Sequence, residues 1–191
     1  MSVLPYQQWV EEFKPLLGVT PRLEGFCYLV RVLLQREKPV IIETWTLREL
    51  DNWVGDGQST RIWDWVVRKT GGQAVSGDCS WEACNLAELA CPNVGIFKVD
   101  SVVWLREAGF GKPSLLYLDS YDYHLGQELN ACMHQVAELA AIWDRLPSGC
   151  LIASDDSHGP NAGKPALTRR VFQALGIEPV VDGYIVVWRK P

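Results

Sequence analysis

Short apolar runs in this sequence end repeatedly on an acidic residue. The run at 114–118 stops at Asp119, and similar runs end at Glu43, Asp78, Asp100 and the pair Asp155–Asp156. An apolar run of this length, bounded by turn residues, is typical of a strand buried on both faces. Because the carboxyl ends of parallel strands meet at one edge of a sheet, where ligands bind, we expect these acids to line a common site.

Two glycines and two of these acids follow an order that suits an adenosine. Gly55 and Gly57 precede a predicted helix, so the backbone can approach a ligand closely and the helix offers free N–H groups. Asp78 lies 21 positions after Gly57, where a carboxylate can accept both hydroxyls of a ribose. Asp100, one strand further out, is placed to accept an adenine amino group. The segment lacks the lysine of a P-loop, which disfavours that type of nucleotide site.

The elements that must position these residues alternate along the chain. Apolar spacing predicts helices at 5–17, 22–36, 59–69, 80–90, 101–108, 127–145 and 166–175. Strands are predicted at 39–43, 73–77, 94–99, 114–119 and 150–154, followed by a hairpin of 177–181 and 184–188 around Asp182-Gly183. This order predicts a three-layer, Rossmann-like α/β sandwich with a mostly parallel seven-stranded sheet and an antiparallel C-terminal hairpin. We expect one domain, with residues 1–37 as an N-terminal helical extension of a core at 38–191.

These motifs resemble the class I S-adenosylmethionine-dependent methyltransferases, and within them the small O-methyltransferase-like branch. The resemblance spans about residues 38–191 and rests on the segments 40–43, 55–60, 75–78, 99–101, 115–120 and 148–156. It implies that Glu43, Gly55, Gly57 and Ser59 face the methionine end of the cofactor, Asp78 its ribose and Asp100 its adenine, with Asp119 completing the binding set. The family usually has glycine directly after the first acid, whereas Thr44-Trp45-Thr46 stand there in this chain.

The resemblance also implies a second half-site, on the other side of the transferred methyl group. In metal-dependent relatives an acid after the fourth strand and an acidic pair after the fifth bind a divalent cation, and Asp119, Asp155 and Asp156 occupy those positions. Such oxygen ligands suit Mg²⁺, which would also relieve their mutual repulsion. The alternative is that these carboxylates cap loop backbone.

Histidines are the candidate general bases, because their pKa lies near neutrality. His158 follows the acid pair by two residues, in a glycine-rich loop, and we expect it together with Asp119 to be catalytic. His124 is the second candidate, and His134 is expected on the polar face of its helix. Lys164 is expected to be exposed, or to contact an anionic substrate. Trp45 and Trp53, in the long connection after the first strand, are expected to cover the site or to stack on an aromatic substrate.

The overall composition limits the classes of partner that we expect for this protein. The chain has 191 residues and a net charge of −5, and it contains no Lys/Arg cluster that would track a nucleic acid. The six cysteines show no zinc-ligand spacing, and we expect reduced thiols. The sequence shows neither a signal-peptide pattern nor an apolar run long enough for a membrane span, so we expect a cytoplasmic protein. The two N-terminal helices could cover a sheet edge, a substrate pocket or a subunit interface, so a homodimer is one possibility.

We therefore expect an enzyme that transfers a methyl group from S-adenosylmethionine to an oxygen of a small molecule, with Mg²⁺ as an optional second cofactor. Two alternatives remain. The altered first motif would also fit a catalytically inactive domain that binds a nucleotide or a partner. An NAD-dependent enzyme would use the adenosine site but would have no need of the acidic pair.

Overall fold

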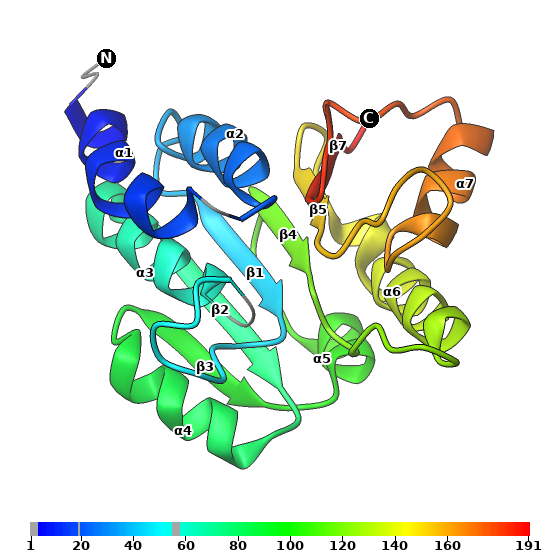
Figure 1. The fold of residues 1–191 in the computed structure, drawn as a ribbon, viewed down its shortest axis with the longest axis horizontal. Helices are drawn as coiled ribbons and strands as arrows, with labels where there is room; N and C mark the ends of the chain where they lie inside the picture. Colours follow the sequence, from blue (N-terminus) through cyan, green and yellow to red (C-terminus); the bar gives the residue numbers. More distant parts are fainter. Residues whose placement is uncertain (1–3, 19, 55–57) are drawn as a thin grey trace.

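Seven strands form a single sheet in the order β3-β2-β1-β4-β5-β7-β6 (Figure 1). The computed structural model describes residues 4–18, 20–54 and 58–191. The strands are β1 (Val40–Thr44), β2 (Gln73–Asp78), β3 (Val94–Lys98), β4 (Leu115–Leu118), β5 (Leu151–Ser154), β6 (Val181–Asp182) and β7 (Val186–Arg189). β1 to β5 pair in parallel, whereas β7 runs antiparallel to both β5 and β6. The predicted sheet and its reversed end are confirmed.

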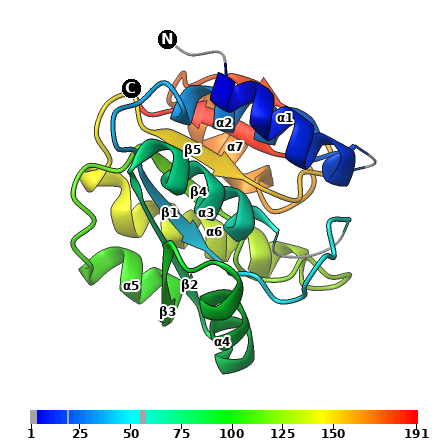
Figure 2. The same cartoon turned by 90° about the vertical axis from the view of Figure 1, so that its left-hand side faces the viewer.

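Helices cover both faces of this sheet (Figures 1 and 2). Helices α1 (Leu4–Leu17), α2 (Leu23–Leu33), α3 (Ser59–Thr70) and α4 (Trp81–Ala90) pack on one face, and α5 (Ser101–Glu107), α6 (Glu128–Ile142) and α7 (Ala166–Ala174) on the other. Consecutive strand residues point to opposite faces, so Ile41 enters the first hydrophobic cluster and Ile42 the second. The result is the predicted three-layer sandwich.

Several predicted elements are shorter in the structure. The helix predicted at 22–36 ends at Leu33. The helix predicted at 127–145 ends at Ile142 and continues as a 3₁₀ turn, Trp143–Arg145. The strand predicted at 177–181 shrinks to the two residues of β6. Ile177 N–H donates to Phe172 O at 2.8 Å and so extends the turn after α7, while Pro179 has no N–H to offer a neighbouring strand.

The N-terminal helices belong to the main core. Trp9, Phe13 and Phe26 lie in the same buried cluster as Ile41 and Tyr117 of the sheet. Phe26 of α2 stacks on Tyr117 of β4, with 6.0 Å between ring centroids. These helices therefore pack on one face of the sheet, rather than at its edge as one of the three expected roles had it. None of the helices in the described part of the chain is both long and apolar enough to cross a membrane.

Gly25 allows α2 to approach the C-terminal hairpin, and this contact can be tested. A Cβ at Gly25 would lie 2.5 Å from Cβ of Ile185, which cannot rotate away. Gly25→Ala should therefore destabilise the protein by about 1–3 kcal/mol and lower the Tm by several degrees in a thermal melt. Gly109→Ala is the matched control, since a Cβ there meets nothing within 4 Å. Equal Tm values for the two variants would contradict the close approach.

Candidate functional site

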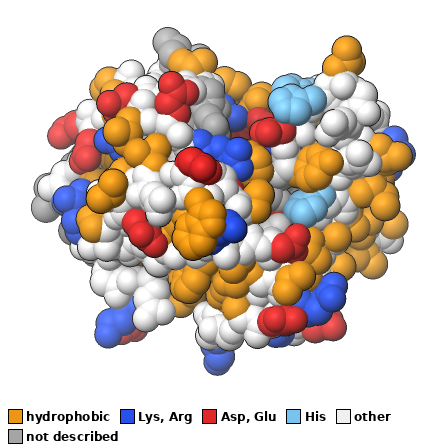
Figure 3. Space-filling model, turned by 90° about the horizontal axis from the view of Figure 1, so that it is seen from below, with side chains coloured by type: hydrophobic (Ala, Val, Ile, Leu, Met, Phe, Trp, Pro, Cys, Tyr) orange, Lys and Arg blue, Asp and Glu red, His pale blue; other side chains and the backbone are white. Residues whose placement is uncertain are grey.

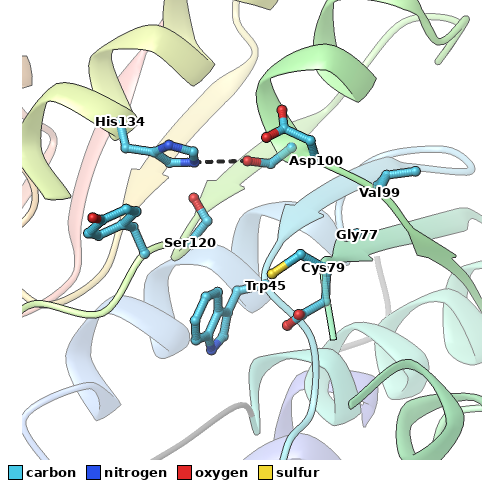
Figure 4. Close-up of a pocket in the computed structure, with 10 residues that line it drawn as sticks. Trp45, Gly77, Cys79, Val99, Asp100, Ser120 and His134 are labelled. Atoms are coloured by element: carbon cyan, nitrogen blue, oxygen red, sulfur yellow. Dashed lines mark hydrogen bonds between the residues drawn. The ribbon is translucent and has the colours of Figure 1, made fainter. Parts of the chain in front are cut away.

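A pocket of about 100 Å³ lies at the carboxyl ends of β2 and β3 (Figure 4). It brings together Asp78 and Asp100, the two acids that we assigned to an adenosine. The remaining lining residues come from the ends of β1, β2, β3 and β4 and from α5 and α6: Trp45, Gly77, Cys79, Val99, Ser101, Ser120, Tyr121 and His134. The pocket combines apolar walls with a few polar groups, as small-molecule sites do.

Asp78 is buried and already bonded to the protein. Only 3% of the residue is exposed. Its carboxylate accepts hydrogen bonds from the backbone N–H groups of Thr46, at 3.3 Å, and Ser80, at 2.8 Å. Arg48 adds a two-pronged ion pair, with Nε 3.2 Å from Oδ2 and Nη2 3.0 Å from Oδ1. A ribose can therefore bind Asp78 only by sharing this carboxylate with Arg48 or by displacing Arg48 from it.

Trp45 lines the pocket from just after β1. Its φ of +83° lies in the region that glycine adopts readily and bulky residues avoid. The guanidinium of Arg48 lies 3.3 Å from the centroid of the Trp45 ring, a favourable cation–π arrangement. The chain thus keeps the glycine-like backbone turn after β1 but adds a large ring, which lines the pocket as expected of a covering residue.

Trp53 does not share this position. It is 8% exposed and packs edge-on against Phe13, with 5.6 Å between centroids. The expectation that Trp53 covers the site is therefore wrong, because the connection after β1 turns this ring into the core under α1. Arg61 lies over the same ring at 5.1 Å.

The Asp100 side of the pocket contains a histidine that we had placed elsewhere. Asp100 is exposed and caps α5, accepting a hydrogen bond from Val103 N–H at 2.9 Å. His134 Nε2 lies 3.0 Å from Ser101 Oγ and 3.5 Å from a carboxylate oxygen of Glu138 (Figure 4). Its hydrogen bond with Glu138 raises the pKa of His134. The polar-face expectation is wrong; the available signal was the i, i+4 spacing of His134 and Glu138.

Glu43 is enclosed beneath α3. It is fully buried, and its carboxylate accepts hydrogen bonds from Thr60 Oγ1 and Trp63 Nε1, each at 2.7 Å. Burial raises its pKa to about 7. Ser59 is buried at the start of α3. The predicted ligand contacts of Gly55 and Gly57 lie outside the described residues, and the methionine-binding roles of Glu43 and Ser59 stay predictions.

Asp119, Asp155 and Asp156 do converge, but with two basic side chains among them. Lys164 Nζ lies 2.7 Å from Asp119 Oδ1 and 2.9 Å from Asp156 Oδ2. Arg22 Nε lies 2.7 Å from Asp155 Oδ2, and its Nη2 is 2.9 Å from Asp156 Oδ1. Lys164 is 2% exposed, so the expectation of an exposed lysine is wrong. Over the ranges that the structure describes, no group of three or more His, Cys, Asp or Glu side chains could hold a metal ion.

The charges of this cluster compensate for one another only in part, because burial still raises the pKa of Asp119 and of Asp155. Burial disfavours the charged form of Lys164, but Asp119 and Asp156 outweigh it and raise its pKa. Burial would raise the pKa of Asp156, yet Lys164 and Arg22 hold it below its ordinary value. A lysine with a raised pKa keeps its proton at neutral pH, so Lys164 is unsuited to act as a general base.

The two predicted bases lie at the surface. His158 is exposed between the rings of Tyr123 and Tyr184, with centroids 5.2 and 5.6 Å away. His124 lies 3.6 Å from Asp122, and both side chains are largely exposed. The catalytic role of His158 stays a prediction.

Comparison with known proteins identifies the fold. Neither a protein-family model nor a curated protein matches the sequence. Among solved structures, the MycE methyltransferase of the mycinamycin pathway, in complex with Mg, SAH and mycinamycin VI, superposes with a TM-score of 0.66 at 13% identity, over 97% of this chain and 54% of MycE. This chain has the class I methyltransferase fold. It spans about half the length of MycE.

Two further structures with this fold differ in their acceptor chemistry. The N-methyltransferase NodS from Bradyrhizobium japonicum has a TM-score of 0.55 at 14% identity, over 90% of this chain and 97% of NodS. A SAM-dependent O-methyltransferase from Thermotoga maritima has a TM-score of 0.52 at 14% identity, over 87% of this chain and 64% of that protein. The fold therefore leaves the acceptor atom open.

The raised pKa of Glu43 predicts a pH-dependent stability. The folded state binds this proton more tightly than the unfolded state, so stability falls as pH rises from 4.5 to about 7 and then levels off. The shift corresponds to about 3 kcal/mol at most. Glu43→Gln cannot ionise, so its unfolding free energy relative to wild type should increase across this window in urea titrations.

Glu88→Gln, a change at an exposed residue of α4, is the control. The difference in unfolding free energy between this variant and wild type should not change with pH. If the difference in unfolding free energy between Glu43→Gln and wild type were also constant with pH, the raised pKa of Glu43 would be contradicted.

Proposed function

We propose that the protein is an S-adenosylmethionine-dependent methyltransferase that acts on an oxygen of a small molecule. The observation that carries the proposal is the placement of Asp78 and Asp100 at the ends of adjacent strands, on either side of one pocket. The resemblance assigns the first of these carboxylates to the ribose and the second to the adenine, which supports the pocket as the site of the adenosine part of the cofactor. The structural neighbours with this fold are methyltransferases.

The proposal of a small acceptor rests on charge and on a missing motif. Seen from below in the orientation of Figure 1, the described surface mixes acidic, basic and hydrophobic side chains (Figure 3). A nucleic-acid partner would favour a continuous basic field instead. Asp119-Ser120-Tyr121-Asp122 follows β4, without the paired prolines typical of enzymes that methylate amino groups of nucleic acids.

Each residue of the site has its own role in the proposed reaction. Asp78 would accept the ribose hydroxyls, Asp100 the adenine amino group, and Trp45 would cover the cofactor from the end of β1. When bound, S-adenosylmethionine supplies an electrophilic methyl group. His158 is proposed to take the acceptor proton, since a neutral imidazole beside a hydroxyl increases its nucleophilicity. Asp119, held by Lys164, would border the acceptor.

A catalytically inactive binding domain is the second candidate, and one observation favours it. Arg48 occupies Asp78 and Trp45 stands in a glycine position, so the adenosine site is partly closed by the chain itself. Both candidates share the fold, and ligand binding distinguishes them.

Calorimetric titration with S-adenosylhomocysteine and, separately, with NAD tests the proposed function. We expect the homocysteine ligand to bind and NAD to give no heat. Asp78→Ala should weaken binding at least tenfold, because a ribose loses two hydrogen bonds to a carboxylate. Glu88→Ala, far from the pocket lining, should bind like wild type. Absence of binding by the folded wild type would overturn the proposal, and binding of NAD alone would favour hydride chemistry.

Arg48 provides a second, independent prediction. If ligand must displace Arg48 from Asp78, then Arg48→Ala should tighten S-adenosylhomocysteine binding by about fivefold to tenfold, which is the usual worth of a partly exposed ion pair. Arg61→Ala is the matched control. It removes another basic residue that contacts the same connection, but its partner Asp51 is exposed and remote from Asp78. Weaker binding by Arg48→Ala would show that Arg48 contacts the ligand rather than competing with it.

A further inference from the structure

Lys164 lies where the sequence predicted a divalent cation. Its ammonium group contacts the side chains of Asp119 and Asp156 and also the carbonyl oxygen of Asp119. These are the oxygen types that Mg²⁺ prefers, a carboxylate pair and a backbone carbonyl. A lysine ammonium is a compact charge with three donors. Its described hydrogen-bond and ion-pair partners are oxygens of the acidic edge, and it also lies 5.9 Å from the centroid of the Trp45 ring.

The carboxylate oxygens of Asp155 and Asp156 are also engaged. Both oxygens of Asp155 accept hydrogen bonds: Oδ2 from Arg22 and Tyr117, and Oδ1 from Asp156 N–H. Asp156 Oδ1 accepts from Arg22 and from the Tyr184 hydroxyl, and its Oδ2 pairs with Lys164. A divalent cation would have to displace one or both basic side chains, and while they stay it would be repelled by them.

The loop before Lys164 is shaped to bring its ammonium group back to the acids. Ser157 and Gly163 form an isolated antiparallel bridge, and Lys164 N–H donates to Asp156 O at 3.2 Å. Gly163 has a φ of +88°, and a Cβ there would lie 2.0 Å from Asp156 O, so only glycine fits this turn. The tight return of the chain thus fixes a lysine eight positions after Asp156 directly against it.

We propose that Lys164 is a built-in cation that takes the place of a divalent metal at the acidic edge, so that Asp119, Asp155 and Asp156 do not bind Mg²⁺. The two positive charges of Lys164 and Arg22 stabilise the three buried carboxylates in a geometry that a metal imposes in other sites. The donor set therefore does not fit the metal predicted from the sequence. This inference rests on the cluster alone and holds whether or not the protein transfers methyl groups.

Binding of Mn²⁺, measured by the loss of the free-ion electron paramagnetic resonance signal, tests the proposal. Wild type should leave millimolar Mn²⁺ free, and its Tm should be the same in Mg²⁺ and in EDTA. Lys164→Ala opens space and exposes uncompensated carboxylates, so it should bind Mn²⁺ at least tenfold more tightly than wild type. The double variant Lys164→Ala/Asp119→Asn should lose most of this gained affinity. Lys112→Ala, which removes an exposed lysine, should behave like wild type.

Two results would overturn the proposal. One is Mn²⁺ binding by wild type that Asp119→Asn or Asp156→Asn weakens. The other is a Lys164→Ala variant that gives a folded circular dichroism spectrum but gains no affinity for Mn²⁺. If Lys164→Ala does not fold, the wild-type measurements still decide, because a Tm that Mg²⁺ raises would contradict a metal-free edge.

Discussion

Compensation of buried negative charge governs this structure. A parallel sheet with acids at the ends of its strands gathers carboxylates at one edge, and unpaired they would be too costly to bury. Three basic side chains meet this requirement, each from a segment whose role the sequence left open. Arg22 comes from the start of α2, Arg48 from the connection after β1, and Lys164 from the loop before α7. The ion pairs therefore also hold these segments against the edge of the sheet.

The surroundings of each acidic side chain set its pKa. Glu43 lies near the carboxyl end of β1 and Asp156 follows β5, yet their pKa values move in opposite directions. The hydrogen bonds that Glu43 accepts from described residues come from neutral donors and do not offset burial, whereas Asp156 is held by two cations. One carboxyl is thus poised to change charge near neutral pH, and the other stays ionised.

The sheet was predictable because its signals are local. Runs of apolar residues ending on acids marked β1 to β5, and helical spacing marked the covering layers, which together required parallel pairing. The same patterns located Asp78 and Asp100 beside each other. Arg48 and Lys164 were not predictable as partners, because an ion pair across 30 or 45 residues leaves no periodic trace in the sequence. Trp53 was misplaced because the path of a loop depends on tertiary packing. The position of His134 did have a local signal, its i, i+4 spacing with Glu138.

The contact between Arg22 and Asp155 joins residues 133 positions apart. Ordering so large a loop costs entropy that nearby contacts must first offset. We therefore expect the acidic edge to be completed late in folding, after β5 and the loop that carries Lys164 have joined the sheet. During synthesis Arg22 would emerge more than 130 residues before its partners Asp155 and Asp156. The acidic edge, which borders the proposed acceptor site, would therefore form only after the strands from β1 to β5 have assembled.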